Sequence, residues 1–267
     1  LVAHEKFNMY AYMSIYDAVM KLAIVFLLTF APFDKLIFYA FLILLVSTSS
    51  AVIYNWYCRK HFVECRFSWS FDKSVFKKMF SFSAWDIVGS VAVLGQIQGV
   101  NIIINLFCGT IVNAAYGIAN TVNNIINTFA ANIIIAASPQ IVKSYAQKHL
   151  DEMFSLVINS AKMSSYLLLI IGIPVFVEIE FLLKIWLGEY PSYAPLFLRI
   201  ILVQSWVKTL GEPTVRALHA IGNIKLLNIV VGVILLLILP ITYFLLRFGY
   251  PPEIALGANI ILWTVAI

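Results

Sequence analysis

Residues 226–246 read LLNIVVGVILLLILPITYFLL, an apolar run that contains no charged side chain. The hydrocarbon core of a bilayer is about 30 Å thick, so a helix needs roughly 20 apolar residues to cross it. The run has this length, and polar residues bound it on both sides. It therefore predicts a membrane-spanning helix.

The rest of the chain repeats this pattern. Hydrophobic residues make up 62% of it and charged residues 12%, with a mean hydropathy of +0.92, whereas a soluble domain is about half apolar and about a quarter charged. Eight hydrophobic segments can be read, at residues 10–31, 35–57, 81–108, 110–137, 156–179, 194–220, 226–246 and from 254 onward. The sequence predicts an all-α fold, a polytopic transmembrane helix bundle with about eight membrane segments.

Short motifs are expected to separate or interrupt these segments. The PFD run at residues 32–34 predicts a tight hairpin turn. The SP pair at 138–139 predicts the end of the fourth segment, because proline cannot continue the helical hydrogen bonds. The GEP run at 211–213 predicts an interruption of the sixth segment. Residues 71–80 place apolar side chains and lysines at helical spacing, which is typical of a helix that lies on a membrane surface.

Lysines and arginines concentrate in alternate loops. One set of loops carries Lys6, Arg59, Lys60, Arg66, Lys73, Lys77, Lys78, Lys143, Lys148, Arg216 and Lys225. The other set carries Lys35, Lys184 and Arg247. Loops rich in lysine and arginine remain in the cytoplasm, so the first set is predicted to be cytoplasmic. The net charge of +5 is then explained by the cytoplasmic loops and does not indicate nucleic-acid binding. We expect membrane lipid, and no nucleic acid, as a partner.

Motifs for soluble chemistry are missing from the sequence. It contains no Gly-x-x-x-x-Gly-Lys-Ser/Thr run, the loop that cradles nucleotide phosphates. Cys58, His61 and Cys65 are close in sequence, but no second pair completes a tetrahedral metal site. Glu178 and Glu180 are two residues apart at a helix end and point to different faces. We therefore expect no enzyme, no metal and no cofactor, but a protein that moves a substrate across a membrane.

Two stripes of polar side chains run along the third and fourth segments. At 3.6 residues per turn, the members of each stripe share one arc of their helix. The first stripe is Ser90, Gln98, Asn101 and Asn105, and the second is Asn113, Asn120, Asn124 and Asn127. Outside these arcs lie Gln96, Asn123 and Asn132.

An amide that faces lipid leaves its donors and acceptors unsatisfied, so both stripes are expected to face protein or water. One interpretation is a dry helix pair in which each amide contact contributes about 0.6–2 kcal/mol. The other is the wall of a hydrated cavity, which we favour because the stripes run through most of the membrane depth. Amide walls suit a sugar with many hydroxyl groups. The residues expected to face one common hydrated space are Asn101, Asn105, Asn120, Asn124 and Asn127, with Gln96 outside it.

Charged residues inside the predicted spans are further candidates, because each costs several kcal/mol in lipid. Asp17 and Lys21 are one helical turn apart in the first segment and form either a structural ion pair or part of a functional path. Asp86 and Arg216 lie near segment ends, where a charged side chain can reach the interface. Lys208 has no such explanation, and a cation at this depth would attract the phosphates of a lipid-linked substrate.

Several stretches carry a resemblance to a known family. They are GTIVNAAYGIANTVN at residues 109–123, SPQIVKSYA at 138–146, YCRKHFVECRF at 57–67, FSFSAW at 80–85, KIWLGE at 184–189 and GNIK at 222–225. The chain resembles, over its whole length, the polysaccharide-export branch of the multidrug/oligosaccharidyl-lipid/polysaccharide exporter superfamily, which includes Wzx-type O-antigen flippases.

This resemblance implies a MATE-like, two-lobe transporter, of which the chain would be a fragment. Residues 1–56 would be the last helix hairpin of the first lobe, residues 57–80 the basic cytoplasmic inter-lobe segment, and residues 81–267 the second-lobe helices, truncated at the C-terminus. It also implies alternating access in a bacterial cytoplasmic membrane, an undecaprenyl-diphosphate-linked oligosaccharide as substrate, and glycan polymerases or glycosyltransferases as neighbours. The alternatives are a cation-coupled multidrug exporter of the same superfamily, which should carry a carboxylate in a deep apolar pocket, and a membrane-bound glycan polymerase or ligase, which should carry a large external loop.

Overall fold

The structure is a computed structural model that describes residues 6–29, 34–62, 65, 72–222 and 224–266. Within these residues it contains eight α-helices and no β-strand, so the predicted all-α class is confirmed. The chain divides into two compact units, one formed by the first 72 residues and the other by residues 73–267.

The first unit is a pair of helices, α1 (Phe7–Thr29) and α2 (Lys35–His61). The Asp34 side chain caps α2 by accepting a hydrogen bond of 2.8 Å from the Leu36 backbone N–H. Two polar contacts join the helices: the hydroxyls of Tyr16 and Ser49 lie 2.8 Å apart, and Ser50 donates to Asp17 over 2.6 Å. The predicted turn at residues 32–34 falls largely outside the described residues.

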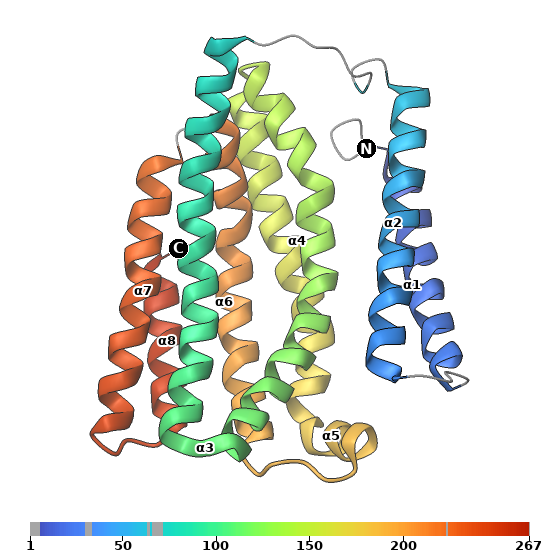
Figure 1. Cartoon of the computed structure of the whole chain (residues 1–267). Coiled ribbons are helices and arrows are strands. Elements are labelled where there is room, and N and C mark those ends of the chain that lie inside the picture. Colours follow the sequence, from blue (N-terminus) through green and yellow to red (C-terminus); the bar gives the residue numbers. More distant parts are fainter. Residues whose placement is uncertain (1–5, 30–33, 63–64, 66–71, 223, 267) are drawn as a thin grey trace. The chain divides into compact units, whose positions relative to one another are not determined.

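The second unit is a helix bundle (Figure 1). Its helices are α3 (Lys73–Ala146), α4 (Leu150–Val177), α5 (Ile179–Leu187), α6 (Ala194–Ile221), α7 (Lys225–Arg247) and α8 (Pro252–Ala266). A core of fully buried side chains, including Ile104, Phe197 and Leu235, holds α3, α6 and α7 together.

Helix α3 consists of two arms that meet at Gly109. This residue has φ 80° and ψ 177°, a conformation that is essentially restricted to glycine. The first arm, residues 73–108, and the second arm, residues 110–146, run in opposite directions from it (Figure 1). The predicted boundary between the third and fourth segments is therefore confirmed.

Three expected breaks are absent from these helices. Pro139 lies inside α3, which continues to Ala146, and Pro213 lies inside α6. Membrane helices tolerate proline because neighbouring groups satisfy the released carbonyls, so proline alone was a poor end signal. The predicted surface helix over residues 71–80 is, from Lys73 onward, the beginning of α3, because no helix breaker separates its lysines from the apolar run that follows. Phe71 lies outside the described residues.

Five helices are long and apolar enough to cross a membrane, namely α1, α2, α3, α4 and α7. Helix α6 has 28 residues but is not in this group, and it carries Arg199, Lys208, Glu212 and Arg216. Charged side chains inside a membrane helix are costly in lipid, so the surroundings of these four residues of α6 bear on function.

The ends of the second unit differ in charge. The start of α3, the junction of α3 with α4 and the junction of α6 with α7 lie at one end, whereas Gly109, α5 and the junction of α7 with α8 lie at the other (Figure 1). The first end carries Lys73, Lys77, Lys78, Lys143, Lys148 and Lys225. This alternation agrees with the charge pattern of the sequence, and the cytoplasmic placement of that end stays a prediction.

Candidate functional site

A cavity of about 320 Å³ lies within the second unit, between both arms of α3, α6 and α8. Its walls carry amides, hydroxyls and charges among apolar side chains. The polar lining residues are Gln96, Tyr116, Asn120, Asn123, Asn124, Asn127, Gln204, Ser205, Lys208, Thr209, Glu212, Arg216 and Asn259. The cavity therefore offers many hydrogen-bonding groups at a depth where lipid offers none.

The second arm of α3 supplies the largest group of amides. Asn120, Asn123, Asn124 and Asn127 follow each other at three- and four-residue spacing, which places them on one side of the helix. Two of them also bond to their own helix: Asn120 Nδ2 donates to the Tyr116 carbonyl over 2.9 Å, and Asn127 Nδ2 donates to the Asn123 carbonyl over 3.0 Å. These bonds fix the direction in which each amide points.

A small network connects this arm to α6. The Ser205 hydroxyl donates to Asn123 Oδ1 over 2.8 Å and accepts from Asn127 Nδ2 over 3.1 Å. Asn123 and Ser205 are both buried, whereas Asn124 is exposed. The interpretation of a dry helix pair thus applies to Asn123, which joins two helices. The interpretation of a cavity wall applies to Asn124, which lines open space.

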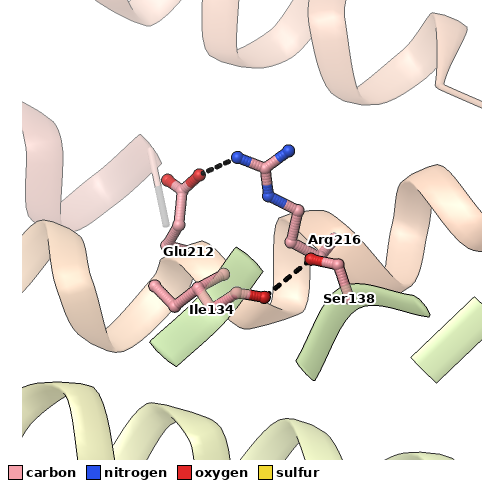
Figure 2. A network of polar contacts seen from close by, with 4 residues as sticks. All are labelled: Ile134, Ser138, Glu212 and Arg216. Carbon is pink, nitrogen blue, oxygen red and sulfur yellow. Dashed lines mark hydrogen bonds and ion pairs between the residues drawn. The ribbon is translucent and has the colours of Figure 1, made fainter. Parts of the chain in front are cut away.

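Helix α6 adds a row of charges at one end of the cavity. Arg216 Nη2 lies 3.0 Å from Glu212 Oε1, one turn away on the same helix, and this pair lies beside Ser138 of α3 (Figure 2). The Ser138 hydroxyl donates to the Ile134 carbonyl over 2.7 Å (Figure 2). Arg216 and Glu212 neutralise each other, which leaves Lys208 as the net charge of the row.

Lys208 lies against an aromatic ring. Its Nζ is 4.9 Å from the centre of the Trp263 ring, within the range of a cation–π interaction. The described residues place no carboxylate within 4.0 Å of it. Trp263 is itself buried, and its indole Nε1 has no hydrogen-bond partner in the described part of the chain. An ammonium group and an indole donor therefore stand together at the cavity wall.

A second cavity, of about 550 Å³, lies between the first arm of α3, α6 and α7. It shares Lys208, Glu212, Arg216 and Trp263 with the first cavity and adds Asp86. The charged row of α6 thus forms a boundary between two cavities of the same unit.

The predicted site residues are only partly brought together. Asn120, Asn124, Asn127 and Lys208 line the first cavity, as expected. Gln98, Asn101 and Asn105 are not among the described residues that line either cavity, and Asn113 is also outside, with a buried Oδ1 that has no partner. Ser90 lines the second cavity instead.

The exclusion of Gln96 from the cavity is wrong. Gln96 is buried and lines the first cavity, because it shares a helix face with Val100 and Ile104, which are both fully buried. Gln98 and Asn105 are exposed and lie about half a turn from that face. The buried face is marked by apolar residues at four-residue spacing, a signal that was present in the sequence but was outweighed by the number of amides on the other face.

Several further lining residues, among them Asn123, Ser205, Asn259 and Trp263, escaped the sequence analysis or were set aside by it. Asn123 lay outside the chosen arc, yet it shares the buried face with Ala119 and Ile126. Ser205 and Asn259 are single polar residues in apolar surroundings, and nothing in their local sequence marks them. Trp263 lies in the last apolar segment, where an aromatic residue gives no sign of a functional role.

Asp17 and Lys21 belong to the first unit and do not form the ion pair considered above. Asp17 instead accepts the hydrogen bond from Ser50, and Lys21 is exposed, with no ion pair to Asp17 within 4.0 Å among the contacts of the described residues. The Asp17 carboxylate can bond to the Ser50 hydroxyl of α2 because α1 and α2 pack closely at this level.

Comparison with known proteins finds no match for this chain among protein-family models, curated proteins or solved structures.

Proposed function

We propose that the protein translocates a lipid-linked oligosaccharide across a bacterial cytoplasmic membrane by alternating access, without making or breaking a covalent bond in it. The observation that carries this proposal is the cavity lined by amides, with Lys208 at its wall and without a matching carboxylate. The resemblance of the sequence to polysaccharide exporters supplies the substrate class, an undecaprenyl-diphosphate-linked repeat unit.

The amides suit a sugar for a chemical reason. Each amide presents two N–H donors and an acceptor oxygen, and each sugar hydroxyl both donates and accepts. Asn120, Asn124 and Gln204 line the cavity from two different helices, so a saccharide between them can exchange its bonds to water for bonds to protein. Because amides carry no charge, such contacts stay weak enough to be released on the other side.

The cation suits the linking phosphates. A diphosphate must leave the aqueous interface, and an isolated charge in an apolar medium costs several kcal/mol or more. A fixed ammonium group lowers this barrier, because Coulomb attraction strengthens as the local dielectric constant falls. Lys208 also lies at the boundary between the two cavities, where it can stay close to an anion that passes from one to the other.

The size of the cavity is also relevant. At about 320 Å³ it is at the lower end of the roughly 300–1,000 Å³ typical of small-molecule sites. It therefore fits the phosphate-proximal part of the substrate, and the remaining sugars would extend beyond it.

The test is Lys208→Ala in the full-length protein, expressed in a strain that lacks the gene. We expect lower surface glycan at equal membrane-inserted protein, and partial activity for Lys208→Arg, which keeps the charge but changes its geometry. Lys143→Ala is the matched control, since Lys143 lies outside both cavities. Full export by Lys208→Ala at equal expression would remove this residue from the path.

A cation-coupled exporter remains the second candidate, because one observation favours it. Asp86 is a carboxylate that lines the second cavity, whose walls combine apolar residues such as Val93 and Leu235 with the charged side chains of α6. On this alternative, Asp86→Asn abolishes ion-dependent efflux of an apolar cation from loaded vesicles, while surface glycan is unchanged. Loss of glycan export together with unchanged efflux would favour the flippase.

A further inference from the structure

A third concave region lies at the lysine-rich end of the second unit, away from the two cavities described above. It encloses about 790 Å³ between the beginning of α3 and the junction of α6 with α7. None of its lining residues lines either of the other cavities. The pocket is therefore distinct from both cavities.

The charge of this pocket is positive. Lys77, Lys78 and Lys225 line it together with the hydroxyls of Ser81 and Ser83, and no carboxylate is among its described lining residues. None of the three lysines forms an ion pair within 4.0 Å among the contacts of the described residues. Three ammonium groups and two hydroxyls around one concavity match the oxygens of a phosphate group.

The backbone adds to this field. Helix α7 begins at the pocket with Ile224 as its N-cap, and the side chain of Ile224 cannot accept a hydrogen bond from the first N–H groups of the helix. These groups carry the positive end of the helix dipole. An anion seated beside Lys225 would therefore be attracted by the helix end as well as by the lysines.

The floor of the pocket is held in place by contacts among three helices. Lys225 Nζ lies 4.9 Å from the centre of the Trp85 ring, and Asn228 Nδ2 donates to the Trp85 carbonyl over 2.8 Å. The rings of Phe82 and His219 meet edge to face at 6.1 Å. These contacts hold Lys225 and the residues beneath it in place, whereas Lys77 and Lys78 are exposed on the first turns of α3.

The rim of the pocket is apolar. Met79 lines it and is 65% exposed, and Phe80, the next residue, is 66% exposed. The hydrophobic segment that is expected to enter the bilayer begins directly afterwards, at Ser81. A soluble phosphate would gain nothing from these side chains, whereas the acyl chains of a lipid would cover them.

We propose that this pocket binds the headgroup of an anionic glycerophospholipid in the leaflet at this end of the bundle. The phosphodiester lies between Lys77, Lys78 and Lys225, and the acyl chains pass over Met79 and Phe80. Basic pockets between membrane helices are known to hold anionic headgroups, and each cation near the surface contributes measurably to such binding. The site is separate from the proposed transport path.

The test uses the whole 267-residue chain, purified in a neutral detergent and titrated with fluorescent phosphatidylglycerol. The variant Lys77→Gln/Lys225→Gln is expected to raise Kd by roughly fivefold for each lysine removed, about 25-fold in total. The matched control is Lys143→Gln/Lys148→Gln, which removes two lysines from the same end of the bundle but outside the pocket, and it should change Kd less than about twofold.

Two further sets of measurements separate the possible explanations. Lys77→Arg/Lys225→Arg should retain most of the affinity, which distinguishes loss of charge from loss of fold. Glycerol phosphate in large excess should not displace the lipid, and fluorescent phosphatidylcholine should bind far more weakly. Equal loss in the pocket and control pairs, no loss in the pocket pair, displacement by glycerol phosphate, or equal binding of phosphatidylcholine would each overturn the proposal.

Discussion

The two arms of α3 have similar lengths and both carry several amides, yet the structure uses them differently. The second arm turns Asn120, Asn123, Asn124 and Asn127 toward a cavity, whereas Gln96 is the one amide that the described residues of the first arm contribute to it. The number of amides on a helix therefore does not determine whether they line a cavity. What determines it is the face that the neighbouring helices leave open.

The neighbours of the first arm explain its behaviour. A side chain at Gly89 would meet Asn228 at 2.9 Å, and one at Gly99 would meet Leu239 at 2.5 Å. The first arm thus packs closely on α7 at two positions where an added Cβ would force the side chain of Asn228 or Leu239 to move. On the second arm, by contrast, a Cβ at Gly117 would meet nothing within 4 Å.

This contrast gives the largest expected effect. Gly99→Leu should lower the free energy of unfolding by about 1–3 kcal/mol, because the new side chain overpacks against Leu239. Gly117→Leu should be neutral or stabilising, since leucine has about 0.8 kcal/mol better helix propensity than glycine. Thermal unfolding of both variants in detergent is the measurement, and similar melting temperatures would contradict the packing difference between the arms.

The amides themselves give a smaller effect. Asn123→Ala removes the bond between the second arm and Ser205 and should cost about 0.6–2 kcal/mol. Asn105→Ala on the first arm removes an exposed side chain and should change stability by less than about 0.5 kcal/mol. A double-mutant cycle with Ser205→Ala isolates the Asn123 contact. Absence of coupling in that cycle would mean that the network does not hold the helices together.

The smallest effect concerns access of water to the two arms. In a background without native cysteines, we expect the Asn124→Cys variant to react several-fold faster with a water-soluble maleimide than the Gln98→Cys variant. The thiolate is the reactive form, and it is favoured in a hydrated, polar cavity. The rates are measured by gel shift in isolated membranes, and faster labelling at position 98 would reverse the assignment of the arms.

Much of the fold follows from the sequence because the bilayer simplifies the problem. Apolar length predicted the long helices but not the short helix α5, and Gly109 was correctly placed between two segments. Pro139 and Pro213 were wrongly predicted to end or interrupt their helices. The rule that proline breaks a soluble helix does not hold inside a membrane helix bundle. The pairing of α6 with the second arm depends on Asn123 and Ser205, 82 residues apart, and no local pattern contains that information.

The candidate site was harder to predict for a related reason. A helical wheel gives the relative directions of side chains on one helix, but not the direction of the bundle axis. For the first arm the inward direction is defined by Val100 and Ile104, and the amides were a stronger but misleading signal. Lys208 does line the cavity, because a charged side chain in a membrane helix needs polar surroundings whatever the packing, and its functional role stays a prediction.

Gly109 joins the two arms without any intervening loop, and this restricts how the chain can change in length. A loop absorbs an inserted or deleted residue at little cost, whereas one additional residue within either arm would rotate everything beyond it by about 100° around the helix axis. Asn120 and Asn124 would then leave the cavity together, although neither had been replaced. Among homologous sequences, length differences in this region should consequently be rare between residues 96 and 127 and be tolerated instead near residues 147–149, where the helices are already separated.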